Sequence, residues 1–77
     1  MSLRASVVEQ LRRHGIEPDA PPAELHERLN ELYLQEVRRL RERQRAGEIA
    51  LRDYAFHVER LKRRYPLLGL PLQAWTE

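Results

Sequence analysis

The sequence predicts an all-α fold: a three-helix protein with helices at about residues 3–14, 22–46 and 50–65, in one helical domain spanning residues 1–77. Two observations lead to this prediction. Apolar residues recur at spacings of three and four, the period of an amphipathic helix. Each such stretch also ends at a glycine or a proline, the residues that most often terminate helices. We therefore expect a long central helix, a hairpin between the second and third helices, and no sheet.

The first predicted helix begins near Ser2, which is a plausible N-cap. Its apolar positions follow helical spacing, at Leu3, Val7, Val8 and Leu11. Gly15 occupies the position of a left-handed C′ residue, and Ile16 follows it. This order predicts a Schellman ending, with Ile16 packed against Leu11.

The second helix has the clearest pattern. Its apolar residues fall within an arc of roughly 140° at 100° per residue, at Leu25, Leu29, Leu32, Tyr33, Val37 and Leu40. Asp19 is a candidate N-cap, and Pro21 or Pro22 suits the first turn because no amide donor is needed there. Gly47 ends the helix near Arg45 or Ala46.

The third helix begins with a hydrophobic staple in which Ala50 is the N-cap, Ile49 the preceding residue and Tyr54 its partner. Its predicted buried stripe consists of Leu51, Tyr54, Val58, Leu61 and Tyr65. Pro66 ends the helix, because the residue before a proline resists helical geometry.

The C-terminal segment after Pro66 is unusually apolar for a chain end. Its large apolar residues are Leu67, Leu68, Leu70, Leu72 and Trp75. Gly69 and Pro71 prevent a long helix. We expect an extended apolar strap that packs on the helices or on another chain.

Composition restricts the class of protein. A chain of 77 residues buries only about 60% of its unfolded surface, so its stability is marginal without added support. With no cysteine, that support is neither a disulfide nor a thiolate-bound metal, and a cytoplasmic location is expected. No apolar run approaches the ~20 residues of a membrane span, and the start of the chain lacks a signal peptide, so we expect a soluble protein without membrane contact.

No catalytic or metal centre is evident. The three histidines, His14, His26 and His57, have no partner ligand at helical spacing, so we expect surface or partly packed side chains. The aliphatic hydroxyls lie near the termini, and the three glycines are scattered. These features predict a non-enzymatic protein that uses no cofactor.

Apolar residues outside the main stripes predict a protein partner. Leu34 lies about 180° from Leu25 around the second helix, and Phe56 projects away from the stripe of the third. Together with Leu70 and Trp75, they are the expected contact residues of a small interaction module that forms a homodimer or docks on another protein.

The high arginine content suggests an alternative function. Thirteen of the fourteen basic residues are arginine, yet the net charge is only +2. A GC-rich genome, ion-pair networks that resist heat, and phosphate binding each account for such a bias. Arg38, Arg41 and Arg45 share one helical face, so the alternative function is nucleic-acid binding through the C-terminal half of the second helix.

The expected antiparallel packing of the second and third helices argues against nucleic-acid binding. Antiparallel helices place their basic C-terminal ends at opposite poles, and the third helix is about 22 Å long at 1.5 Å per residue. The basic clusters are therefore expected not to join into one patch. In each helix the acidic residues lie near the N-terminus and the basic residues near the C-terminus. This order interacts favourably with the helix dipole, so it explains the basic clusters without a ligand. In the sequence, aromatic residues are not interleaved with the arginines of the second helix as stacking platforms would be.

Residues 40–68 resemble the short bacterial helical hairpin domains known as SHOCT. The matching positions are Leu40, Gly47, Ile49, Asp53-Tyr54, Leu61 and Leu67-Leu68. This resemblance implies a bacterial protein that oligomerises or tethers other proteins.

Residues 8–32 look like a SAP-type helix–loop–helix, through the turn Gly15-Ile16, then Ala23-Glu24-Leu25 and Arg28-Leu29. Pro21-Pro22 stand where that motif carries glycine and lysine. The second resemblance implies DNA binding.

Overall fold

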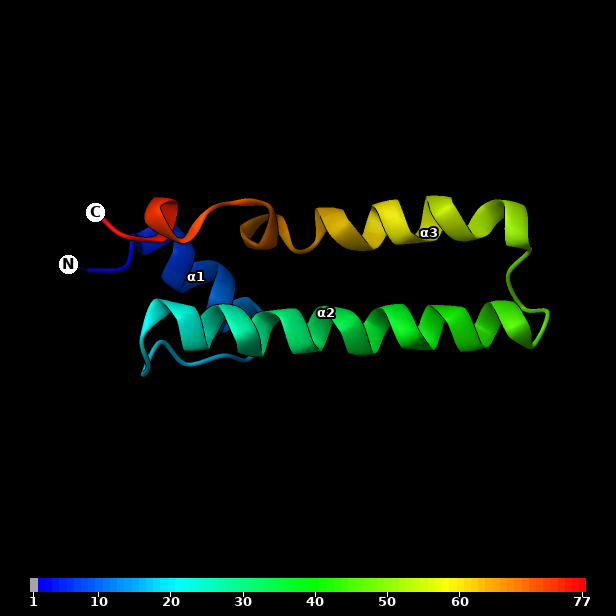
Figure 1. Cartoon of the computed structure of the whole chain (residues 1–77), viewed down its shortest axis with the longest axis horizontal. Coiled ribbons are helices and arrows are strands. Elements are labelled where there is room, and N and C mark those ends of the chain that lie inside the picture. Colours follow the sequence, from blue (N-terminus) through cyan, green and yellow to red (C-terminus); the bar gives the residue numbers. More distant parts are fainter. Residues whose placement is uncertain (1) are drawn as a thin grey trace.

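The computed structural model describes residues 2–77 and confirms the all-α, three-helix fold. Met1, part of the predicted domain 1–77, lies outside the described residues. The elements in chain order are α1 (Ala5–Arg13), α2 (Pro22–Arg45), α3 (Leu51–Arg63) and the short 3₁₀ helices η1 (Pro66–Gly69) and η2 (Leu72–Trp75). α2 and α3 form an antiparallel hairpin, and α1 and the C-terminal segment gather at the end away from its turn (Figure 1). The molecule is elongated, at 47 × 17 × 17 Å.

Two glycines end helices as the sequence predicts. Gly15 has a φ of 76°, and the amide of Ile16 donates to the carbonyl of Leu11 at 2.9 Å. This is the predicted Schellman ending, which satisfies carbonyls that would otherwise lack a donor. Gly47, with a φ of 82°, ends α2 in the same way. Both backbone conformations favour glycine because it has no Cβ.

The beginnings of two helices differ from prediction. Ser2 does not cap α1, because its carbonyl accepts the amide of Glu77 and Leu3 forms an antiparallel bridge with Thr76. This pairing holds the N-terminal residues extended, so Arg4 is the N-cap.

Asp19 likewise does not cap α2. Its carboxylate accepts a hydrogen bond from Arg28 at 3.0 Å, while Pro21 is the N-cap and Pro22 the first helical residue. Ala50 is the N-cap of α3, as predicted.

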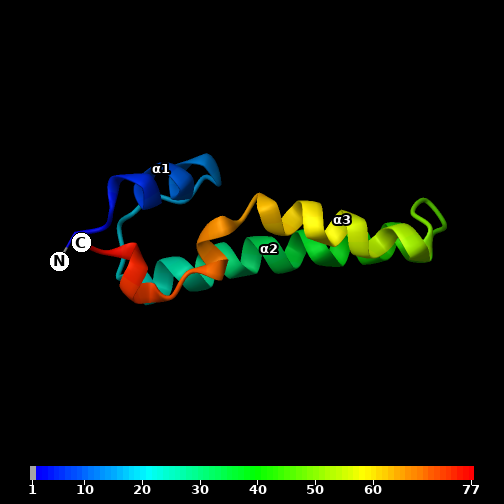
Figure 2. The ribbon, with the colours of Figure 1, turned by 90° about the horizontal axis from the view of Figure 1, so that it is seen from above.

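The core lies at the end where α1, α2 and the C-terminal segment meet. Figure 2 shows α1 lying against one side of the hairpin beside the N-terminal half of α2. The buried cluster comprises Val7, Leu11, Ile16, Leu25, Leu29, Leu61, Tyr65, Leu67 and Trp75. Towards the hairpin turn only α2 and α3 remain, without a third element over them (Figure 2).

The turn region explains one wrong prediction. Leu51 was expected in the buried stripe of α3, but it is 73% exposed. It is the first residue of that helix, at the thin end of the molecule, and Ile49 fills the space inside the turn instead.

The C-terminal segment forms two 3₁₀ helices instead of an extended strap, and it completes the core of its own chain. Trp75 is fully buried, its indole N–H donates to the carbonyl of Leu67 at 3.3 Å, and its own carbonyl accepts the amide of Arg4. The prediction that Trp75 contacts a partner is therefore wrong, because the side chain is enclosed by its own chain.

Within residues 2–77, the structure has no helix with the length and apolar character needed to cross a bilayer.

Candidate functional site

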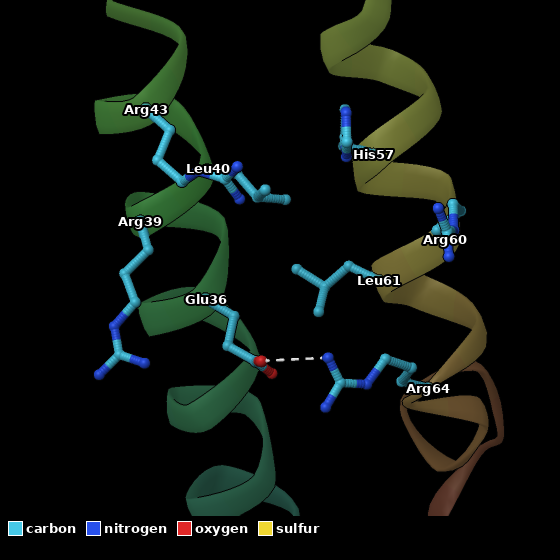
Figure 3. A pocket seen from close by; sticks show the side chains of 8 residues that line it. All are labelled: Glu36, Arg39, Leu40, Arg43, His57, Arg60, Leu61 and Arg64. Atoms are coloured by element: carbon cyan, nitrogen blue, oxygen red, sulfur yellow. Dashed lines mark ion pairs between the residues drawn. The ribbon is translucent and has the colours of Figure 1, made fainter. Parts of the chain in front are cut away.

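A groove of about 450 Å³ lies between α2 and α3 (Figure 3). Both helices line it, α2 with Glu36, Arg39, Leu40 and Arg43, and α3 with His57, Arg60, Leu61 and Arg64. We call this hollow the arginine groove. It holds four guanidinium groups and one carboxylate, so positive charge dominates it.

The two walls of the groove are built on the same sequence pattern. Each helix carries Arg-Leu-x-x-Arg, as Arg39-Leu40 with Arg43 and as Arg60-Leu61 with Arg64. Residues three and four apart share a helical face, so each pattern places its two arginines side by side, with the leucine next to them toward the facing helix. The two leucines point toward one another between the helices (Figure 3). Packing of the apolar residues thus fixes the helix rotation that brings the arginines together.

Glu36 is the only carboxylate of the groove. It pairs with the guanidinium of Arg64 at 3.5 Å and accepts a hydrogen bond from the hydroxyl of Tyr65. Within residues 2–77, Arg39, Arg43 and Arg60 have no carboxylate within 4.0 Å. Three guanidinium groups are therefore available for an anionic ligand, and guanidinium matches the geometry of phosphate oxygens.

Tyr65 supports the groove from the core side. Burial and the hydrogen bond to Glu36 raise the pKa of the Tyr65 hydroxyl from its ordinary 10.0 to about 12. Its ring stacks on His14, with centroids 4.3 Å apart, and meets Tyr33 edge-on at 5.5 Å. Tyr65 therefore joins all three α-helices around the carboxylate that neutralises Arg64.

Positive charge continues beyond the groove. A second hollow, toward α1, is lined in part by Arg13, Arg63 and Arg64, so Arg64 borders both hollows. Arg13 is paired with Glu9 at 2.6 Å, whereas Arg63 has no carboxylate within 4.0 Å among residues 2–77. The basic strip thus extends from α2 across α3 to the C-terminal end of α1.

The other side of the hairpin is apolar. A hollow there is lined by Asn30 and Tyr33 of α2, Lys62 of α3, and Tyr65, Pro66, Leu68 and Gly69 after it. Helical spacing places Val37 next along this side of α2, and Leu51 and Val58 along α3. Leu51 is exposed, and the other two are half-buried.

The four residues predicted to contact a partner do not form one surface. Leu34 is half-buried, and helical spacing places it opposite the buried Leu25, close to Arg38, Arg41 and Arg45. Phe56, 62% exposed, projects from α3 beside residues of the arginine groove, and Leu70, 43% exposed, follows η1 in the C-terminal segment. Only the first two lie on the hairpin, and they lie on different helices of it.

The arginines of the groove differ from those predicted for nucleic-acid binding. Arg38, Arg41 and Arg45 are exposed, and none of them lines the groove. The expectation that the basic clusters at the C-terminal ends of α2 and α3 do not join into one patch is wrong for Arg43 and Arg64, which line the same groove. The helices are antiparallel, but Arg39 and Arg43 lie before the end of α2 and line the same hollow as Arg60 and Arg64. The repeated Arg-Leu-x-x-Arg pattern is the sequence signal that identifies this arrangement.

The histidines have separate surroundings. The Nε2 of His14 donates to the carbonyl of Arg64 at 2.9 Å, His26 lies beside Trp75, and His57 lines the groove. No cluster of three or more histidines and carboxylates arranged to hold a metal ion occurs in the described chain, residues 2–77.

Comparisons with models of protein families, with curated proteins and with solved structures give no match. The SHOCT-type and SAP-type resemblances remain predictions.

Proposed function

We propose that the protein is a small non-enzymatic interaction module that binds a phosphate-bearing polyanion in the arginine groove. The observation that supports this is the placement of Arg39, Arg43 and Arg60 around one hollow without a carboxylate partner. A polyanion would displace water and counterions from these groups, which is the main source of affinity for nucleic-acid backbones. This proposal keeps the nucleic-acid alternative but moves it to a different set of arginines.

The test compares two variants of equal charge. Changing Arg39, Arg43 and Arg60 to glutamine should weaken binding of a fluorescein-labelled oligonucleotide about a hundredfold near 0.1 M salt, because each lost single-strand phosphate contact removes about 0.7 from the salt slope. Fluorescence anisotropy at several salt concentrations measures both affinity and slope, and inorganic polyphosphate should compete.

The matched control changes Arg38, Arg41 and Arg45 to glutamine. These residues also have no carboxylate within 4.0 Å among residues 2–77, but they lie outside the groove. We expect this variant to bind within about threefold of the unmodified protein once general charge screening is included. Equal losses in the two variants would show that the groove is not the site.

A second candidate function is self-association through the apolar side of the hairpin, as a homodimer. The observation in its favour is the row of incompletely buried apolar residues on this side. Leu51 is 73% exposed, and Val37 and Val58 are half-buried. Two hairpins packed by this side would make a four-helix arrangement with a thicker core.

Sedimentation at micromolar concentration tests the dimer. The unmodified protein should show a species of about twice the 9.2 kDa chain mass, and Leu51→Glu should shift it to the monomer. Phe56→Glu is the control, because Phe56 is similarly exposed but lies on the side of α3 that faces the arginine groove. A single monomeric species at all concentrations would rule out this candidate.

A further inference from the structure

An exposed aromatic ring stands next to the arginine groove. Phe56 is 62% exposed and belongs to neither the core nor the residues packed against it. The guanidinium carbon of Arg60 lies 5.8 Å from the centre of its ring, and the ring of His57 lies 6.2 Å away at 76°. Both neighbours also line the groove, so the phenylalanine ring and the free guanidinium groups form one continuous surface.

The combination of an exposed ring and guanidinium groups restricts the class of anion that fits this surface. An acidic protein segment or inorganic polyphosphate would use the guanidinium groups, but neither needs a flat apolar ring beside them. Proteins that hold single-stranded nucleic acid combine a basic groove for the backbone with aromatic rings on which bases stack. Phe56 and the three free arginines supply both parts within one hairpin.

The shape of the hairpin disfavours a duplex. The molecule is 17 Å across its short axes, whereas the major groove of B-DNA is about 12 Å wide and admits a single helix. The bases of a duplex are also stacked on each other, so no base is free to pack on Phe56. An unpaired strand has exposed base faces and reaches the bottom of a groove between helices.

We infer that the polyanion is single-stranded nucleic acid, with phosphates on Arg39, Arg43 and Arg60 and one base stacked on Phe56. The inference rests on the proposed function and names its ligand class. The strand continues toward the second hollow, where Arg63 provides a further contact.

The experiment compares two labelled strands of about 12 nucleotides, oligothymidylate and an abasic strand of the same length and charge. The unmodified protein should bind oligothymidylate at least about fivefold more tightly, because the abasic strand has no base to stack. Phe56→Ala should reduce oligothymidylate binding to the abasic level and leave abasic binding unchanged. Phe56→Trp should restore the preference.

Leu72→Ala is the matched control, since it also removes an exposed large apolar side chain, but one in η2 that lines neither the arginine groove nor the second hollow. It should leave both affinities unchanged, and far-UV circular dichroism should show equal helicity in all variants. Equal binding of the two strands, or tighter binding of duplex DNA or of polyglutamate, would overturn this inference. Equal strand binding that still depends on Arg39, Arg43 and Arg60 would leave the proposed function intact, whereas absence of binding to every probe would overturn both.

Discussion

Replacing Trp75 with alanine should destabilise the protein by about 3 to 5 kcal/mol, the usual cost of removing a large aromatic side chain from a core. Trp75 is fully buried, and its indole N–H is hydrogen-bonded to Leu67. A 77-residue domain has a total stability of about 4 to 12 kcal/mol, so this single change removes a large part of it. Thermal unfolding followed by circular dichroism should show the melting temperature lowered by at least about 12 °C.

Leu72→Ala provides the control within the same 3₁₀ helix. Leu72 is 38% exposed, so its truncation should cost less than about 1 kcal/mol. If Trp75→Ala unfolds at nearly the same temperature as Leu72→Ala, the C-terminal segment does not form part of the core in solution.

Replacing Tyr65 with alanine should have the second largest effect, a loss of about 3 kcal/mol or more in the free energy of unfolding. Tyr65 is 5% exposed and contacts His14 of the α1 end and Tyr33 of α2, while its hydroxyl donates to Glu36. Its removal opens a cavity between all three helices. Urea unfolding curves measure the change in the free energy of unfolding, provided that the two proteins have the same m-value.

Tyr65→Phe separates the ring from the hydroxyl. This variant should keep most of the free energy of unfolding. It should also change how that free energy depends on pH in the alkaline range. The pKa of Tyr65 is raised to about 12 in the folded protein from 10.0, so between these values the unfolded chain releases a proton that the folded chain retains. Stability therefore falls as pH rises from 10 toward 12. Tyr65→Phe should remove this part of the slope, and an unchanged slope would contradict the assigned environment of Tyr65.

The features that the sequence predicts correctly are those with local causes. The endings at Gly15 and Gly47 follow from the need for a left-handed residue, and the start of α2 at Pro22 follows from the fixed φ of proline. The burial of Leu25 and Leu29 follows from helical periodicity alone. Each of these depends on residues within one or two turns of helix.

The features that the sequence does not predict depend on contacts between distant residues. Ser2 loses its capping role because the far end of the chain pairs with it. The burial of Trp75 depends on where the C-terminal segment lies, and residue patterns do not specify that position. The arginine groove depends on the register and rotation of α2 against α3, because Arg39 and Arg60 line one hollow only when Leu40 packs toward Leu61.

The bridge between Leu3 and Thr76 also affects the order of folding during translation. The ribosome releases α1 first, but the residues that cover Val7 and Leu11 include Trp75, which is synthesised more than sixty residues later. The α2–α3 hairpin forms from neighbouring segments and does not need to wait for that residue. The part of the α1 face that Trp75 covers thus stays exposed until that residue is made, so the nascent chain presents apolar surface that the folded protein buries.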